Sequence, residues 1–236
     1  MLENKIWTQA VKMARGVNGD AEKLASLVRE NPWLPKHWGP LGAMVRRQQS
    51  GTLLLAAAWD DHADAVAMLA PLSDVRALDC LGDSALFYAL LCEKNEKRQK
   101  MVEALAPYAD LGGGSKDRAN KIPAIISLER GQSATAGLIF SLMTSGQMER
   151  RCDRGANVWH YICRSSDAEL SWIDMIEQKP GAALLLDVED DEGETPRSLA
   201  RKRSDEFGAR LLAKAEAVEI GLAIAKAAGE KKRSRL

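Results

Sequence analysis

Two stretches of the sequence follow one pattern: Asp79-Cys80-Leu81-Gly82-Asp83-Ser84-Ala85-Leu86-Phe87-Tyr88-Ala89 and Asp190-Asp191-Glu192-Gly193-Glu194-Thr195-Pro196-Arg197-Ser198-Leu199-Ala200. Each has an Asp three residues before a Gly, a hydroxyl side chain two residues after that Gly, and an Ala five residues after the hydroxyl. Glycine permits the backbone conformation of a tight turn, Ser or Thr can cap a helix, and a small Ala lets neighbouring helices approach closely. The pattern therefore predicts a turn followed by a closely packed helix.

Three weaker copies lie elsewhere in the chain. The copy that matches the pattern best begins at Ser50-Gly51-Thr52. A second copy covers residues 153–162 and has Asn157 in place of the Ser or Thr. The weakest copy covers residues 117–124 and has Asn120 in place of the turn glycine. The five positions equivalent to the packing alanine are separated by 32, 38, 35 and 38 residues, and are Ala57, Ala89, Ser127, Ile162 and Ala200. The longer spacings require insertions, for which residues 112–115, Gly-Gly-Gly-Ser, are an expected place.

These units resemble the repeats of the ankyrin family, whose period is about 33 residues. The resemblance covers roughly residues 50–215 and implies an all-α, ankyrin-type helical solenoid of about five to six helix-turn-helix units with divergent capping helices. Apolar periodicity predicts a helical pair at residues 5–15 and 20–30, and second helices of the repeats over 64–70, 100–109, 134–144 and 170–177.

The expected domain organisation has three parts. Residues 1–49 form an N-terminal helical cap and a connector rich in Pro and Trp, residues 50–215 form the repeats, and residues 216–236 form the end of the last helix and a basic tail. A targeting role for that tail and plain solvation are both open.

Charge is balanced overall but not along the chain. The 236 residues include 33 Lys and Arg and 33 Asp and Glu, so a generally basic nucleic-acid binder is excluded and no direct nucleic-acid binding is expected. The net charges of residues 1–50, 51–196 and 197–236 are +4, −10 and +6. The acidic middle favours a partner with a basic surface, a solvated set of turns being the alternative; mimicry of a nucleic acid would need one continuous acidic surface.

Metal, cofactor and membrane functions find no support in the sequence. The cysteines Cys80, Cys92, Cys152 and Cys163 contain no Cys-x-x-Cys pair, so a zinc ribbon is excluded, and we expect reduced thiols in the cytoplasm. The acidic residues 187–194 lack the spacing of an EF-hand loop, so no metal or cofactor is expected. The N-terminus has no unbroken apolar stretch of seven residues, so we expect no signal peptide, and no run approaches the eighteen apolar residues of a membrane span.

Catalysis is the alternative to binding. His160 and Cys163 are three residues apart, which places them on one helix face, so an enzyme or small-ligand pocket there must be considered. No Gly-rich oxyanion turn accompanies them, and we therefore predict no catalytic residue.

The leading prediction is a non-enzymatic protein-interaction module that binds, sequesters or adapts a partner. By analogy with the family, stand-alone chains of this size with eroded repeats are bacterial or phage products of the immunity, inhibitor or effector type. The resemblance also implies that turn tips and first helices form a concave recognition surface, on which Trp and Arg are favoured contact residues. The residues expected on it are Trp59, Asp60, Arg76, Arg118, Arg151, Arg154, Trp159, Asp190, Asp191 and Glu192.

Overall fold

The computed structural model describes residues 2–16, 21–41, 50–80, 82–115, 119–177, 179, 181–217 and 220. The chain divides into two compact units, Met1–Ser127 and Leu128–Leu236. This division runs through the expected repeat region. Residues 42–49, at the end of the predicted connector, and nearly all of the predicted tail lie outside the described residues.

Unit 1 begins with the helical pair that periodicity predicts. Helix α1 (Leu2–Ala14) packs against α2 (Ala21–Glu30). After the short helix η1 (Leu34–Lys36), β1 (Gly39–Pro40) pairs antiparallel with β2 (Ser50–Gly51). Trp7 of α1 donates from Nε1 to the carbonyl oxygen of Pro40 at 2.7 Å, and its ring meets that of His37 edge to face. The Pro- and Trp-rich segment is thereby held against the first helix.

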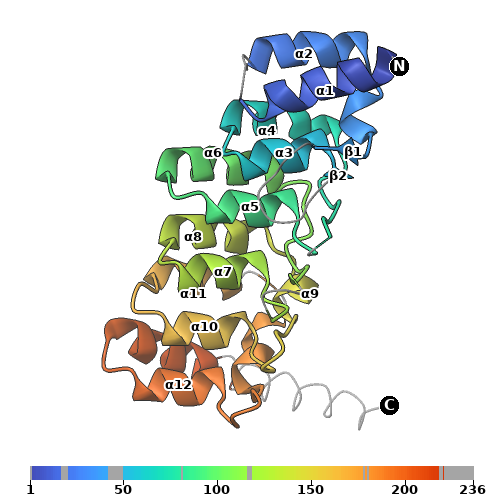
Figure 1. Ribbon diagram of the computed structural model, residues 1–236. Coiled ribbons are helices and arrows are strands. Elements are labelled where there is room, and N and C mark those ends of the chain that lie inside the picture. The colour runs from blue at the N-terminus through green and yellow to red at the C-terminus, as the bar shows by residue number, and fades with distance from the viewer. Residues whose placement is uncertain are drawn as a thin grey trace, which may run out of the picture. The chain divides into compact units, whose positions relative to one another are not determined.

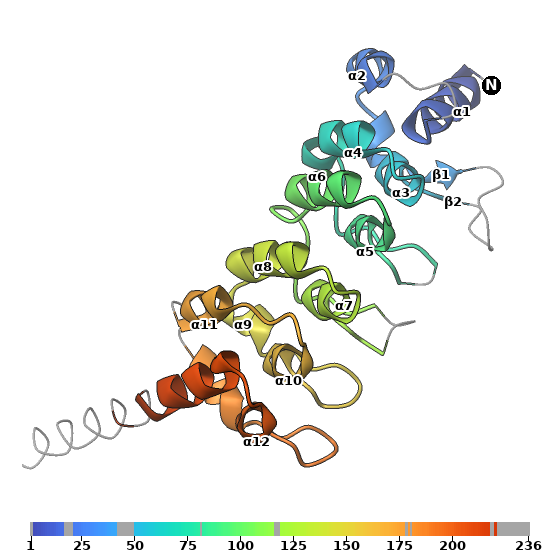
Figure 2. The same cartoon turned by 90° about the vertical axis from the view of Figure 1, so that its left-hand side faces the viewer.

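The rest of unit 1 consists of stacked helix pairs (Figure 1). The elements are α3 (Leu53–Trp59), α4 (Ala63–Leu69), η2 (Ala70–Leu72), α5 (Ala85–Leu91), α6 (Asn95–Leu105) and the first part of α7 (Pro123–Glu129). The first helices α3 and α5 pack on each other, and so do the second helices α4 and α6. Viewed along the helices, they form two layers, and the turn that leads into α5 projects beyond the layer of first helices (Figure 2).

Unit 2 repeats this plan. Its elements are α8 (Ser133–Leu142), α9 (Ser145–Met148), α10 (Val158–Arg164), α11 (Leu170–Glu177), η4 (Ala182–Asp187), α12 (Pro196–Lys202) and a helix over residues 206–217. The first helices α10 and α12 pack together, and the second helices α8 and α11 pack together (Figure 2). The expectation of an all-α chain of helix-turn-helix units is confirmed.

The turns before α5, α10 and α12 share one geometry. In each, a backbone N–H donates to the carbonyl oxygen four residues later, as from Asp79 to Asp83 at 3.0 Å and from Asp190 to Glu194 at 2.9 Å. The predicted turn glycines have left-handed φ values of +81° at Gly82, +69° at Gly155 and +74° at Gly193, which side chains with a Cβ disfavour. The predicted role of these glycines is confirmed.

Helix capping follows the prediction at most units. Thr52 Oγ1 accepts from the N–H of Leu55, Thr195 forms a capping box with Ser198, and Asn157 replaces the hydroxyl by accepting from two N–H groups of α10. Ser84 is the exception, because its side chain makes no capping hydrogen bond to α5. There the turn is fixed instead by Asp79, whose carboxylate accepts from the N–H of Asp83.

The core lies where the packing positions predict. The side chains of Ala57, Ala89, Ser127, Ile162 and Ala200 are all inaccessible to solvent. Ser127 is tolerated in this core because its hydroxyl donates to the carbonyl oxygen of Pro123 at 3.0 Å. A unit of two short helices cannot bury its apolar face alone, so stacking of units within each compact part creates this core.

Candidate protein-binding surface

A cleft of about 360 Å³ opens beside the C-terminal ends of α3 and α5 in unit 1. It is lined by two aromatic side chains, one aliphatic side chain and three charged ones: Trp59, Tyr88, Leu91, Asp61, Glu93 and Lys94. The rings of Trp59 and Tyr88 meet edge to face with their centroids 4.8 Å apart. Tyr88 is buried, whereas Trp59 is only partly buried and contributes surface to the cleft.

The wall of the cleft at Asp61 is firmly fixed. Asp61 has a φ of +55°, which is uncommon for a residue with a Cβ. Its carbonyl oxygen accepts from Lys97 Nζ at 3.0 Å. The Cys92 thiol donates to the carbonyl oxygen of Lys94 at 3.6 Å. Burial, and after it the Asp61 side chain, raise the pKa of Cys92 above its usual value. The backbone of Asp61 is therefore held at the edge of the cleft by Lys97.

Asp60, which we expected on the recognition surface, has a bonded partner inside unit 1. Its carboxylate accepts from Arg15 Nε at 2.5 Å, and both side chains are about three-quarters buried. This ion pair connects the end of α1 to the end of α3. Asp60 therefore positions the residues beside the cleft and has little free charge to offer a partner.

Arg76 is exposed at a turn of unit 1 and lines a second, smaller hollow. This hollow has a volume of about 140 Å³ and includes Leu78, of which 51% is exposed, Phe87 and Asp110. The carboxylate of Asp110 is bonded within its own turn, because it accepts from the N–H of Gly112. The hollow is close in size to a cavity that holds benzene, so it would take one apolar side chain.

In unit 2 several acidic residues form ion pairs with bases of the same unit. Arg164 binds Asp190 at 2.7 Å, Arg197 binds Asp187 at 2.6 Å, and Lys202 binds Glu194 at 2.7 Å. Asp190 was expected on the surface, and this expectation is wrong: its side chain is 2% exposed. It also accepts from the N–H groups of Glu192 and Glu194, so it forms the turn and does not contact solvent.

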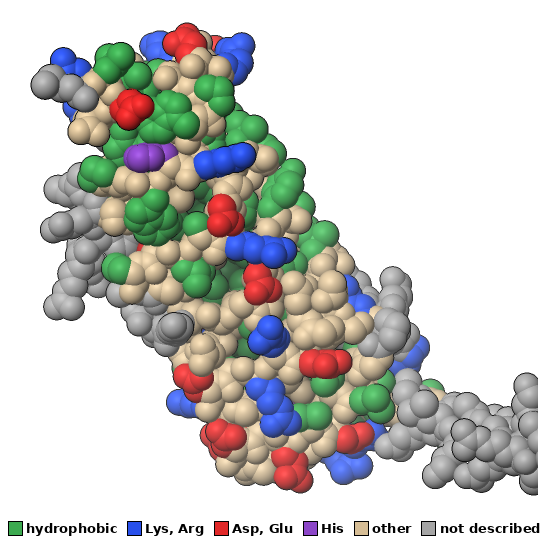
Figure 3. Space-filling model, turned by 90° about the vertical axis from the view of Figure 1, so that its right-hand side faces the viewer, with side chains coloured by type: hydrophobic (Ala, Val, Ile, Leu, Met, Phe, Trp, Pro, Cys, Tyr) green, Lys and Arg blue, Asp and Glu red, His purple; other side chains and the backbone are tan. Residues whose placement is uncertain are grey.

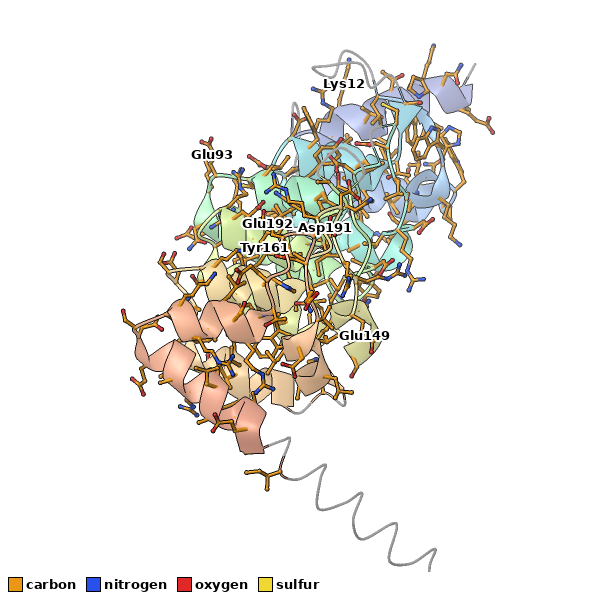
Figure 4. The ribbon with its side chains drawn as sticks, turned by 90° about the horizontal axis from the view of Figure 1, so that it is seen from below. Lys12, Glu93, Glu149, Tyr161, Asp191 and Glu192 are labelled. Carbon is orange, nitrogen blue, oxygen red and sulfur yellow. The ribbon has the colours of Figure 1, made fainter. Side chains whose placement is uncertain are left out.

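The other expected residues of unit 2 turns are exposed. They are Arg151, Arg154, Asp191 and Glu192. The two acidic ones are labelled in Figure 4. On the face shown in Figure 3, acidic and basic side chains of unit 2 are interspersed, whereas hydrophobic side chains cover much of unit 1. The acidic excess of the sequence therefore does not form one acidic patch on this face of unit 2. Arg118 lies outside the described residues.

Trp159 was also expected on the surface, but this expectation is wrong because the residue is buried. Only 2% of the residue is exposed, and its Nε1 donates to the carbonyl oxygen of Ala182 at 3.1 Å. Trp159 is the second residue of α10, where it packs against the following segment of unit 2. It thus belongs to the core.

His160 and Cys163 are structural residues. His160 Nε2 lies 3.0 Å from the carbonyl oxygen of Glu194, and Nδ1 lies 3.1 Å from the N–H of Asn157, so both ring nitrogens are occupied. Burial raises the pKa of the Cys163 thiol to about 12, so it is protonated and not nucleophilic at neutral pH. The geometry therefore contradicts a Cys-His nucleophile pair.

Within the described ranges, no group of three or more His, Cys, Asp or Glu side chains could hold a metal ion. The described helices also include none with the length and apolar character required to cross a membrane.

Five residues of the cleft were missed by sequence reasoning, which singled out only Trp59. The repeat alignment contained the signal for two of them. Leu91 lies 32 residues after Trp59, the spacing of their two units, and Tyr88 lies three residues earlier on the same helix. Residues three apart on a helix share a face, so their proximity to Trp59 could have been predicted.

The fold is similar to that of a solved ankyrin-repeat structure. No protein-family model matches this chain, and no curated protein matches it in sequence. Among solved structures, the chain is similar to an ankyrin repeat domain from Acinetobacter baumannii AYE, with 18% identity, a TM-score of 0.62, and coverage of 88% of this chain and 97% of that one. It is also similar to a chain in the complex of the predatory endopeptidase Bd0816 from Bdellovibrio bacteriovorus with immunity protein Bd3460. That match has 17% identity, a TM-score of 0.51 and coverage of 89% and 97%. These similarities establish an ankyrin-repeat-like fold.

Proposed function

We propose that this chain is a non-enzymatic protein-binding module that recognises its partner with the first-helix side of unit 1. The cleft at Trp59 carries the proposal. It combines an aromatic pair and Leu91 with a margin of charged side chains, which is the composition of a protein-binding hot spot surrounded by a polar rim. The alternative, an enzyme centred on His160 and Cys163, has no support, because both groups are committed to the core.

Other exposed residues extend this proposed surface in each unit. In unit 1, Arg76 and Leu78 offer a charged and an apolar contact at the turn tips. In unit 2, Arg151, Arg154, Asp191 and Glu192 offer charges of both signs, so a partner there needs a mixed surface and not a uniformly basic one. The four unpaired cysteines support the expectation of a reducing compartment such as the cytoplasm.

An inhibitory or immunity role is the form of partner binding that we favour. Its support is the similarity to a chain in a structure that contains an endopeptidase and an immunity protein. In such a role, binding itself is the activity, because a blocked partner needs no chemical step by this chain.

The test is affinity capture from an extract of the source organism with three baits: the unchanged chain, Trp59→Ala and Trp38→Ala. Trp38 is a matched control, because it is 46% exposed and lies in the segment before β1, outside the cleft. We expect a protein that is retained by the unchanged chain and by Trp38→Ala and is lost with Trp59→Ala. The same order should hold for the purified pair by titration calorimetry.

Thermal unfolding of each bait controls for damage to the fold, and Glu93→Lys gives a second test at an exposed position. If purified Trp59→Ala and Glu93→Lys bind the partner as tightly as the unchanged chain does, the cleft is not its recognition site. A chemical conversion of the partner by the purified chain would contradict a non-enzymatic role.

A further inference from the structure

We infer that the Trp59 cleft receives an arginine side chain of the partner protein. This inference rests on the proposed function and names the chemistry that the cleft selects. It follows from the aromatic surface, the carboxylates and the volume of the cleft, each of which matches one part of an arginine side chain.

The aromatic surface matches the planar guanidinium group. Trp59 is partly exposed in the cleft, and its ring packs edge to face against that of Tyr88. Among the described residues, none accepts a hydrogen bond from Trp59 Nε1. A tryptophan ring attracts a cation over its face, and guanidinium does so more often than ammonium because it is planar and weakly hydrated.

The carboxylates match the guanidinium donors. Asp61 and Glu93 both line the cleft, and neither has a Lys or Arg side chain bonded to its carboxylate in the described part of the chain. Figure 4 shows Glu93 projecting outward from the segment that joins α5 to α6. The fork of N–H donors in arginine suits two such acceptors better than the single ammonium of lysine does.

Lys94 and Lys97 would repel a cation in the cleft, but the position of each limits this repulsion. Lys94 lines the cleft but is exposed, so its ammonium can extend into solvent while its stem stays against the wall. Lys97 donates to the backbone of Asp61 and leaves the carboxylate available. The lining side chains thus carry two negative charges and one positive charge, which favours a cationic occupant.

The volume admits the whole side chain. About 360 Å³ is more than twice the size of a cavity that holds benzene, so a guanidinium group and its aliphatic stem both fit. Leu91 provides the apolar contact for the stem.

Two small molecules test the inference: N-acetyl-arginine methylamide, and N-acetyl-citrulline methylamide, which has the same shape but no charge. Each is titrated into the full-length 15N-labelled chain, and the indole N–H signals of the six tryptophans are followed by NMR. The Trp59 signal is assigned by its disappearance in Trp59→Phe. The variants Glu93→Gln and Glu96→Gln are titrated in parallel; Glu96 is the matched control, an exposed glutamate outside the cleft.

We expect the arginine compound alone to shift the Trp59 signal with saturation, and Glu93→Gln to weaken its binding at least fivefold while Glu96→Gln leaves it unchanged. Equal shifts by the citrulline compound, an unchanged affinity in Glu93→Gln, or no saturable shift with arginine would overturn the inference. The two proposals fail separately. If Trp59→Ala abolishes partner binding but the arginine compound does not bind to the chain, only the inference is wrong. If the arginine compound binds but the purified partner binds Trp59→Ala as tightly as the unchanged chain, the proposed function is wrong.

Discussion

The His160 ring joins α10 to the turn before α12 by placing Nε2 3.0 Å from the carbonyl oxygen of Glu194. A carbonyl oxygen can only accept, so Nε2 carries the proton. Nδ1 then accepts from the N–H of Asn157, and the ring is neutral. The same residue thus caps its own helix and holds the next unit of the repeat.

This arrangement predicts a pH-dependent stability of unit 2. Burial, the largest effect, lowers the pKa of His160 below 6.5, so the unfolded chain binds the proton more readily than the folded one. Stability contributed by the neutral ring is therefore complete above about pH 6.5 and is lost as the pH falls below that value. Urea unfolding between pH 7.5 and pH 5 should show this decline.

The test variant is His160→Ala, which removes both ring nitrogens and retains His37 and His62 as an internal reference. We expect it to be less stable at pH 7.5 by about 1–3 kcal/mol, because the Asn157 N–H loses its acceptor and the Glu194 carbonyl keeps only the Asp190 N–H as a donor. Its stability should fall less than that of the unchanged chain as the pH is lowered. If the free energies of unfolding of the two proteins fall equally as the pH is lowered, protonation of His160 is not coupled to unfolding.

A second prediction concerns the turn glycine Gly155. Its φ is +69°, and a Cβ placed there would lie 2.5 Å from Asp191 Oδ1. Gly155→Ala should therefore destabilise the chain by about 1–2 kcal/mol from the backbone alone, with the contact adding to this cost. Gly146→Ala is the matched control, because no atom lies within 4 Å of its Cβ position in α9. It should leave stability unchanged or raise it by up to about 1 kcal/mol in thermal or urea unfolding; equal effects of the two variants would contradict the turn assignment.

How far the sequence predicts this molecule depends on the kind of information that each residue carries. The turn glycines, the caps at Thr52 and Thr195, and the buried Ala57 could be predicted, because their roles depend on backbone conformation and on a repeated spacing. Exposure could not be predicted in the same way. Trp159 and Asp190 have types that are frequent in interfaces, but one fills the core and the other is paired with Arg164.

The cleft shows the same limit. Its members come from two helices and the loops that follow them. Asp61 and Glu93 lie 32 residues apart, at equivalent positions of two units, but this spacing does not show whether their carboxylates are paired. Which carboxylates are free depends on where each lysine and arginine reaches in three dimensions. Sequence counting therefore found an acidic excess but could not show that Asp187, Asp190 and Glu194 are paired with bases of unit 2.

A third prediction concerns the cysteines. Cys80 is exposed, whereas Cys92, Cys152 and Cys163 are buried and unpaired. Burial also raises the pKa of Cys163 to about 12 and raises that of Cys92. A thiol reagent at pH 8 should modify one cysteine rapidly in the native chain and all four in urea. Cys80→Ser should abolish the rapid phase, and a rapid phase that survives in this variant would place a second thiol at the surface.

The last prediction concerns the ion pair of Arg15 and Asp60, which connects the helical cap of unit 1 to its first repeat. Both side chains are about three-quarters buried, so the pair is less screened by solvent than one at the surface. A double-mutant cycle of Arg15→Gln, Asp60→Asn and the combined variant isolates their interaction. We expect a coupling of about 1 kcal/mol in urea unfolding, near the upper end for partly exposed pairs. Lys100 and Asp64 provide the comparison: they also form an ion pair in unit 1, but more than half of each side chain is exposed. Their coupling should be smaller and should vanish in 1 M salt, whereas the pair at Asp60 should retain most of its coupling. If the two pairs respond equally to salt, burial does not strengthen the contact between α1 and α3.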